Sequence, residues 1–249
     1  MHHQCILKEP SVSIATLADP ATPAASRAQQ MIGRIAVDLP GATAVFRRLK
    51  LDFCCGGQMA LADVCRDKGL DVQAVLAELA TLDRGASKPV QREPAALIDD
   101  IIHRFHDVHR AQLPELIRMA RRVEAVHRDN AQVPAGLADL LEQMEGELVE
   151  HMAQEEGVLF PAMRKRSPAA SQPIGALREE HTAHGAMLER LVALTRNHVA
   201  PEEACNTWRA LYAGTRQFAD DLIEHIHLEN NVLFPQFESQ GCGCGSGTC

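Results

Sequence analysis

Two stretches of the sequence place a histidine four residues before a glutamate inside the same longer pattern. One is EHMAQEEGVLFPAM at residues 150–163, and the other is EHIHLENNVLFPQF at residues 224–237. Seven identities recur at one offset of 74 positions without a gap, which indicates an internal duplication. On a helix, a histidine and a glutamate at this spacing direct a ring nitrogen and a carboxylate oxygen toward one point. Both atoms are ligands of transition metals, so the repeat predicts a metal site.

Both histidine–glutamate pairs interrupt the apolar face of a predicted helix. His225 and Glu229 continue a row of apolar residues on one helix face that begins at Leu211. His151 and Glu155 continue the corresponding row that begins at Leu137. A carboxylate removed from water without a partner costs several kcal/mol. Metal ligation in both copies would compensate for this cost. The alternative is a buried hydrogen-bonded pair that only specifies packing.

Two further helices complete the set of candidate ligands. HDVHRAQL at 106–113 aligns with HTAHGAML at 181–188, and each helix offers two histidines on or near its apolar seam. Each half of the duplication therefore has one helix with histidines and one with the histidine–glutamate pair. If the halves pack as a pseudo-twofold bundle, at least four imidazoles and two carboxylates meet in one interior.

The number and type of these groups restrict the metal. Six ligands exceed the need of one tetrahedral zinc ion, and the set lacks the thiolates of a structural zinc site. If each glutamate bridges two metals and a solvent-derived oxygen bridges them as well, each metal has five ligands and one open position. Nitrogen-rich ligation with carboxylate favours non-haem iron, with manganese or a mixed pair as alternatives.

The composition predicts an all-α protein that can position these residues. The chain has 249 residues with 46% hydrophobic but only 4% aromatic residues, which favours helices over strands. Long amphipathic segments separated by short connections occur at about 95–126, 134–164, 174–197 and 202–238. Four such segments predict an up-down-up-down four-helix bundle.

Charge and hydropathy argue against two classes of partner. A net charge of −8 is not the footprint of a nucleic-acid-binding protein. The opening MHHQCILKEP lacks the apolar core of a signal peptide, and no stretch approaches ~20 uninterrupted apolar residues. We therefore expect a cytoplasmic protein with no membrane association, in which cysteines remain reduced.

Shifts in composition predict the domain organisation. A segment rich in Ala, Thr, Ser and Pro opens the chain, short helices follow, and a polar linker with two prolines precedes the long helices. The predicted parts are a flexible tail at 1–30, a small helical domain at 31–84, a linker at 85–94, the bundle at 95–239 and a Cys/Gly-rich tail at 240–249.

Clustered cysteines are a second candidate for chemistry. LDFCCGG places Cys54 and Cys55 at a predicted turn between two short helices. They are either an exposed dithiol able to exchange thiols, pass electrons or hold iron transiently, or buried small hydrophobic residues. The tail residues Cys242, Cys244 and Cys249 could bind metal or belong to a disordered end, and the sequence leaves both alternatives open.

LDFCCGG, RFHDVHRAQLPEL, REEH and the two EH…VLFP repeats together resemble hemerythrin-like bundles. Within these, the combination is similar to the iron–sulfur cluster repair proteins of the RIC, ScdA type, over roughly residues 31–239. The resemblance implies a hemerythrin-like four-helix bundle preceded by a small helical domain. It also implies two iron ions joined by an oxo or hydroxo bridge. On the matching positions the iron ligands are His106, His151, Glu155, His181, His225 and Glu229.

The same resemblance implies roles for neighbouring residues. Glu147 and Glu180 fall where carboxylates of the family line a polar channel, although both could be solvated surface charges. Cys54 and Cys55 would then serve redox chemistry or iron transfer. For His109 and His184, one turn from predicted ligands, we expect hydrogen bonding behind the ligands rather than ligation.

The resemblance implies that the protein repairs iron–sulfur clusters damaged by nitric oxide or oxidative stress. Iron donation is one means of such repair. The alternative is nitric oxide binding, scavenging or reduction to nitrous oxide, and only reduction would make the protein an enzyme, of the nitric oxide reductase type. An oxygen carrier or sensor leaves Cys54 and Cys55 without a task. The expected partners are nitric oxide or another small diatomic molecule and damaged iron–sulfur proteins as clients, for a monomer or homodimer.

Overall fold

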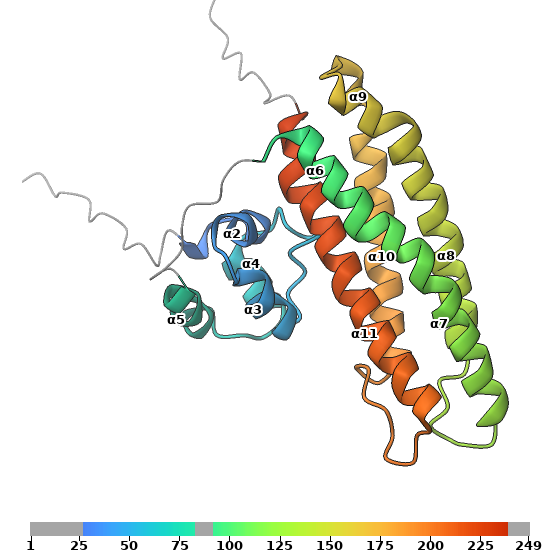
Figure 1. The fold of residues 1–249 in the computed structure, drawn as a ribbon. Helices are drawn as coiled ribbons and strands as arrows, with labels where there is room; N and C mark the ends of the chain where they lie inside the picture. Colours follow the sequence, from blue (N-terminus) through green and yellow to red (C-terminus); the bar gives the residue numbers. More distant parts are fainter. Residues whose placement is uncertain (1–26, 83–91, 239–249) are drawn as a thin grey trace, which may run out of the picture.

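The computed structural model describes residues 27–82 and 92–238, and within these ranges the chain is helical (Figure 1). The described residues form no strand and only one isolated bridge, between Met31 and Ala60. The all-α fold class is therefore confirmed. Most of the predicted amino-terminal tail and linker, and the whole of 240–249 with its three cysteines, lie outside the described residues.

The four predicted long segments are helical, and three of them are interrupted by a π-helical segment. The first segment consists of α6 (Pro94–Ile101), the π-helical η2 (Ile102–His106) and α7 (Asp107–Val126). The second consists of α8 (Leu137–Gln154), the π-helical η3 (Glu155–Leu159) and α9 (Phe160–Arg164). After the short 3₁₀ turn η4 (Pro168–Ser171), the third is α10 (Ile174–Leu194). The fourth is α11 (Asn206–His227), the π-helical η5 (Leu228–Leu233) and the 3₁₀ turn η6 (Phe234–Gln236).

Local chemistry explains several helix boundaries. Pro94 occupies the first turn of α6, where its fixed φ fits a helix and its missing N–H is not needed. Gly136 precedes α8 with φ of 86°, a left-handed conformation that glycine adopts without steric penalty. Pro161 lies in the first turn of α9, directly after the π-helical segment, where its missing N–H is tolerated.

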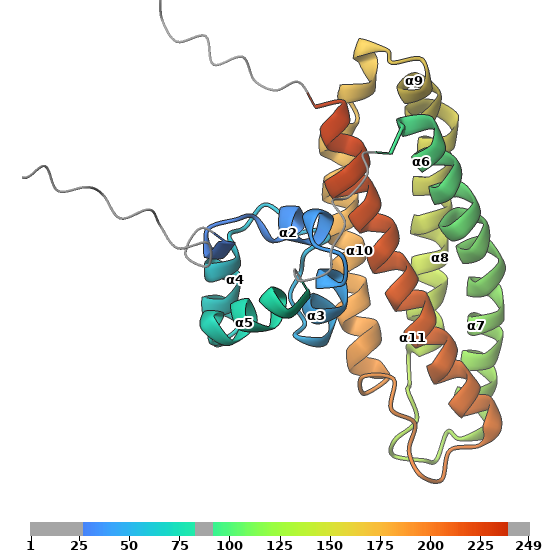
Figure 2. The same ribbon diagram turned by 60° about the vertical axis from the view of Figure 1, so that its left-hand side comes forward.

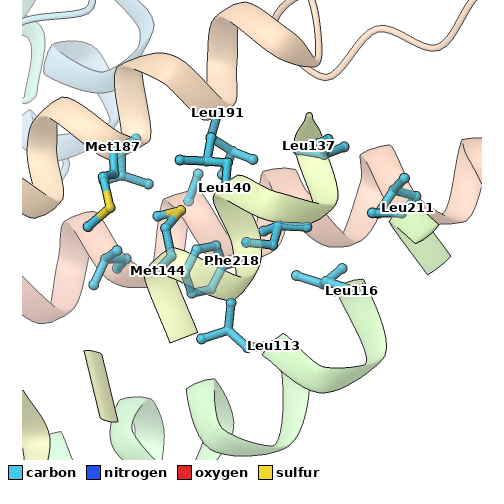
Figure 3. Packing of buried hydrophobic residues seen from close by; sticks show 14 of the residues in the cluster. Leu113, Leu116, Leu137, Leu140, Met144, Met187, Leu191, Leu211 and Phe218 are labelled. Atoms are coloured by element: carbon cyan, nitrogen blue, oxygen red, sulfur yellow. The ribbon is translucent and has the colours of Figure 1, made fainter. Parts of the chain in front are cut away.

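The four helices lie side by side as a bundle (Figures 1 and 2). Helix α7 packs against α8 and α11, and α10 packs against the same two helices. Side chains from all four helices close one half of the interior with an apolar core that includes Leu113, Leu137, Met144, Leu191 and Leu211 (Figure 3). These five side chains are fully buried. Burial of this kind stabilises the bundle by roughly 25 cal/mol per Å² of apolar surface removed from water.

The small domain consists of α2 (Ile32–Asp38), α3 (Ala42–Arg48), α4 (Leu61–Asp67) and α5 (Val72–Leu82) around its own apolar core. It begins before the predicted boundary: Ala28 is buried in this core, and the Gln30 carbonyl accepts a hydrogen bond from the Leu61 amide at 3.0 Å. The domain lies beside α11 in both views, with α2 packed against η5 (Figures 1 and 2).

No helix in the part of the chain that the structure describes is long and apolar enough to cross a membrane.

Candidate metal centre

The six side chains predicted as metal ligands meet in the end of the bundle that contains the π-helical segments. Each is at most 2% exposed. They form two groups of four in which the potential ligand atoms lie within 4.8 Å of one another, and both groups include both glutamates. The first group adds His106 and His225, and the second adds His151 and His181. We call these the first pair and the second pair of histidines.

Within each pair the ring nitrogens converge. Nε2 of His106 lies 3.0 Å from Nε2 of His225, and Nε2 of His181 lies 3.0 Å from Nε2 of His151. The duplication explains this symmetry, because each pair contains one histidine from the first duplicated half of the sequence and one from the second.

The two glutamates connect the pairs. Glu155 Oε2 lies 3.5 Å from Nε2 of both His106 and His151. Glu229 lies 3.2 Å from Nε2 of His181 through Oε2 and 3.1 Å from Nε2 of His225 through Oε1. Each carboxylate thus reaches one histidine of each pair, as a ligand that bridges two metals would.

The buried carboxylates fit a cation. All four carboxylate oxygens of Glu155 and Glu229 are buried without a well-oriented hydrogen bond, although imidazole nitrogens lie nearby. Burial, reinforced by the neighbouring Glu229, raises the pKa of Glu155 well above its usual value. Burial acts in the same direction on Glu229, but His225 and the other imidazoles outweigh it and hold its pKa well below the usual range. Cations between the two carboxylates would remove the cost of burying them together.

Two of the ligand histidines, His151 and His225, are favoured in the neutral state. Burial, and then the proximity of His181, lowers the pKa of His151 to about 2. Burial also lowers the pKa of His225, against the opposing effect of Glu229. A metal ligand must be the neutral imidazole, so these two rings need not lose a proton before they bind.

Groups behind the ligands fix three of the four rings. His106 Nδ1–H donates to Glu156 at 2.7 Å, and His151 Nδ1–H donates to Glu180 at 2.6 Å. His181 Nδ1–H donates to the side-chain oxygen of Asn230 at 2.9 Å. Such bonds leave Nε2 free for the metal and hold the ring in place.

The fourth ring, His225, is held differently. Its Nδ1 has no hydrogen-bond partner among the described residues. The ring of Phe105 stacks on it with centroids 5.5 Å apart and planes inclined by 6°. Packing against an aromatic ring therefore positions His225.

The repeated VLFP motif contributes one such ring to each half. Phe160 stacks on His106 at 5.7 Å, and Phe234 stacks on His181 at 5.9 Å. The duplication thus copied a ligand-supporting phenylalanine along with the histidine and glutamate.

The expectation that His109 and His184 hydrogen-bond behind the ligands is wrong. Neither nitrogen of the buried His109 has a partner among the described residues, and neither does Nδ1 of His184. Apolar packing takes that place for His109, whose ring meets Phe218 edge-on at 5.4 Å. Burial lowers the pKa of His109 to about 2 and that of His184 to about 4, so both rings remain neutral beside the centre.

A surface pocket of about 240 Å³ lies against the second pair. Its lining includes His151 and His184 together with Glu147 and Glu180. Glu147 is exposed and accepts a hydrogen bond from Gln143 at 2.8 Å, whereas the Glu180 side chain is 38% exposed and also binds His151. Both predicted channel residues therefore lie at one opening toward the centre.

The turn with Cys54 and Cys55 faces the bundle, and of the two alternatives the structure favours burial for Cys54. Cys54 is 7% exposed because it packs into the apolar core of the bundle, and Cys55 is half-buried. Their sulfurs are 3.5 Å apart. The bond to Cys55, then burial, raises the pKa of the Cys54 thiol well above its usual value. The two sulfurs and Asp52 form a third group of potential metal ligands.

Glu156 and Asn230 are site residues that the sequence interpretation missed. Each immediately follows a predicted glutamate ligand, and they are 74 positions apart, the offset of the duplication. That register could have identified them, but their different residue types concealed the equivalence.

Comparison with known proteins agrees with this geometry. The family described as hemerythrin HHE cation binding domain matches residues 97–237, and a domain of unknown function, ScdA_N, matches residues 28–83. The fold and the site therefore define a protein of the hemerythrin type, in which histidine and glutamate clusters able to hold a metal are joined to a second, smaller domain.

Relatives that match most of the chain are iron–sulfur cluster repair proteins named YtfE. The protein from Dickeya chrysanthemi is 45% identical over 211 residues, and the one from Citrobacter koseri is 46% identical over 213 residues. Each match covers 83% of this chain and 96% of the relative. The chain belongs to this family of iron–sulfur cluster repair proteins, and the predicted resemblance is confirmed.

Proposed function

We propose that the chain holds two iron ions, one at each histidine pair, with Glu155 and Glu229 as bridging ligands. The proposal rests on one observation: each buried carboxylate reaches one histidine of each pair. The proposed ligands are the six predicted from the sequence, and an oxo or hydroxo bridge would complete the centre. Two such irons would supply open coordination positions and one-electron redox chemistry.

We further propose that this centre serves the repair of iron–sulfur clusters damaged by nitric oxide or oxidative stress, by donating iron. The YtfE relatives are named for such repair. Damaged iron–sulfur proteins in the cytoplasm would be the clients. The pocket beside His151 supports a route by which a metal or small molecule could pass between the centre and the surface.

Glu147 and Glu180 would make that route polar. Glu180 is both hydrogen-bonded to His151 and partly exposed, so it can carry a proton between solvent and the ligand. Cys54 and Cys55 would hold iron in transit or exchange thiols, since they lie with Asp52 at the face of the small domain that meets the bundle.

A second candidate function is nitric oxide binding, with or without reduction to nitrous oxide. Reduction of two molecules of nitric oxide to nitrous oxide and water consumes two electrons and two protons. The carboxylates of the pocket favour this candidate because they could deliver the protons. An oxygen carrier or sensor gains no comparable support from the pocket carboxylates or the Cys54–Cys55 turn.

The test combines metal analysis with a repair assay. We expect two irons per chain after anaerobic loading, and recovery of activity when the loaded protein is mixed with a nitric oxide-damaged iron–sulfur enzyme. Cys54→Ala combined with Cys55→Ala should abolish recovery, whereas the control Cys205→Ala, at the start of α11, should not. Recovery that survives the double substitution would remove the two thiols from the scheme. Absence of recovery with the loaded wild-type protein would refute repair by iron donation.

Nitric oxide alone separates the two candidates. The loaded, reduced protein should form a stable adduct if it binds or scavenges nitric oxide. Sustained nitrous oxide production over several turnovers with an added electron donor would instead establish the reductase.

A further inference from the structure

We infer that Asn230 is a positioning residue through which the docked small domain controls the metal held by the second pair. This makes the metal at His151 and His181 the exchangeable one and the metal at His106 and His225 the retained one. The inference rests on the proposed function, because it assigns different tasks to the two proposed iron positions.

Two residues at equivalent positions of the duplication differ in the second group that each binds. Glu156 and Asn230 occupy equivalent positions, and each accepts a hydrogen bond from Nδ1 of a ligand histidine. Glu156 is a carboxylate that also binds Arg110 at 2.7 Å, so its contacts stay within the bundle. Asn230 is an amide, and its second hydrogen bond leaves the bundle.

That second bond reaches the small domain. Asn230 is 2% exposed, and its Nδ2–H donates to the carbonyl oxygen of Cys54 at 2.9 Å. Since His181 donates to Oδ1, the amide has only one orientation that satisfies both neighbours. The Cys55 thiol also donates to the backbone carbonyl of His181 at 3.2 Å. The Cys54–Cys55 turn is therefore linked to His181 twice: to its side chain through Asn230, and directly to its backbone carbonyl.

The docked contact is closely fitted. Asn231 Nδ2–H donates to the carbonyl of Phe53 at 2.9 Å. A Cβ atom on Gly33 would lie 2.4 Å from the Asn231 side chain, and one on Gly57 would lie 2.6 Å from it. The small domain therefore approaches the bundle by way of glycines, and a modest change at this contact would separate the two surfaces.

Separation would act on His181. Without the Cys54 carbonyl, the buried Nδ2–H of Asn230 loses its partner, and the amide must remain unsatisfied or turn toward water. Turning removes the acceptor that orients His181. Loss of such a partner lowers metal affinity by about 10–100-fold.

Among the described residues, no hydrogen bond joins the small domain to a side chain that holds His106 or His225. Glu156 is held by Arg110 within the bundle, and His225 is fixed by the stacked ring of Phe105. The pocket, by contrast, reaches His151 of the second pair. Docking control and an opening to the surface thus coincide at the same metal position.

The experiment follows the transfer of iron from the anaerobically loaded, full-length protein to an excess of a coloured iron(II) chelator. For the wild-type protein we expect two phases of equal amplitude. Asn231→Ala loosens docking without touching a ligand, and it should accelerate only the faster phase, by about tenfold. Asn230→Ala should accelerate the same phase, and the double substitution should add nothing further.

Glu156→Gln is the matched control, because it alters the equivalent position in the other half. It should accelerate only the slower phase. Mössbauer spectra of the loaded proteins provide a readout independent of transfer: Asn230→Ala and Glu156→Gln should each change one of the two iron signals, and not the same one. Hydrogen exchange at residues 53–57 reports docking, and Gly33→Ala offers a second way to loosen it.

A single phase in the wild-type protein, or equal acceleration of both phases by Asn231→Ala, would overturn the inference. So would unchanged transfer in Asn231→Ala and Gly33→Ala when hydrogen exchange shows that docking is lost. In all these cases the loaded protein still contains two irons. Fewer than two irons per chain would instead refute the proposed function itself.

Discussion

Along the same four helices, one end of the bundle is closed by apolar side chains such as Leu137, Leu141 and Trp208. The other end holds six polar ligands next to a second, smaller apolar cluster that includes Ile101, Met163 and Phe234. The apolar end is α-helical throughout. At the ligand end, three of the four helices contain a π-helical segment, each of which includes a ligand. A π-helical turn inserts a residue and changes the direction of the side chains around it. Departures from regular structure are thus confined to the end where groups must meet in a defined geometry.

Histidine side chains show the same contrast, with the half-buried His198 at the apolar end and the buried rings at the ligand end. At the apolar end, Nδ1 of His198 lies 3.0 Å from the Thr215 hydroxyl and 3.2 Å from the Thr195 hydroxyl, so protein groups satisfy it. At the ligand end, Nε2 atoms face one another across 3.0 Å between buried carboxylates. Protein partners complete the first kind of site, whereas the second kind requires cations.

The largest effect is expected from removing a ligand. His151→Ala and His225→Ala should each lower the iron content of the loaded protein by at least one ion per chain, because each substitution removes one of the two histidine ligands of a metal. Metal analysis after removal of free iron measures this. Added imidazole should restore iron to His151→Ala, which borders the surface pocket, but not to His225→Ala, which lies behind Phe105.

Leu141→Ala is the counterpart of these variants at the apolar end. A variant of either histidine that keeps both irons tightly bound would show that its ring is not a ligand. Iron loss from Leu141→Ala equal to that of the histidine variants would remove the distinction between the ends.

The next effect concerns stability. Leu141 is 0% exposed within the apolar core, so Leu141→Ala should reduce the free energy of unfolding by about 2–5 kcal/mol through lost transfer energy and a cavity. Its iron content under native conditions should stay at the wild-type level. Urea unfolding followed by circular dichroism measures the first quantity. The control Val126→Ala, at a side chain that is 66% exposed, should change stability by less than about 0.5 kcal/mol.

Removing the carboxylates behind the ligands should have a smaller effect. Glu156→Gln and Glu180→Gln each keep the size of the side chain but weaken its bond to a ligand histidine, and iron affinity should fall by about 10–100-fold. Competition with a chelator of known affinity measures the change. Glu179→Gln, an exposed neighbour with the same change of charge, is the control. Equal affinities for Glu180→Gln and Glu179→Gln would indicate that Glu180 contributes only surface charge.

Much of the bundle could be predicted because its signals are local and repeated. The apolar helix faces and the duplicated histidine–glutamate spacing predicted four helices with His151, Glu155, His225 and Glu229 in the interior, where the structure places them. Whether His106 or His109 points to the centre was not decided by spacing alone. The resemblance selected His106, and the structure places it, not His109, among the ligand atoms.

The remaining features depend on contacts between segments distant in sequence. The π-helical segments shift a helical face by one residue, and hydrophobic periodicity assumes a regular helix. The burial of Cys54 results from docking of the small domain on the bundle. The bond from Asn230 to Cys54 spans 176 positions, and no local pattern predicts such a pairing.

The smallest effect is a pH dependence at the apolar end. Burial, with a contribution from Arg216, lowers the pKa of His198 to about 4 from its ordinary value of 6.5. Below pH 6.5 the unfolded chain therefore binds a proton that the folded chain does not, and stability falls as the pH drops from 6.5 toward about 4. Because the ring is partly exposed to solvent, we expect this contribution to be only about 1 kcal/mol.

His198→Gln removes the titrating group, so its stability relative to the wild-type protein should improve by that amount between about pH 7 and about pH 4.5. Unfolding in urea at each pH measures the difference. A stability difference between His198→Gln and wild type that is independent of pH would mean that folding does not change the pKa of this ring. Burial and Arg216 would then not hold it in the neutral state.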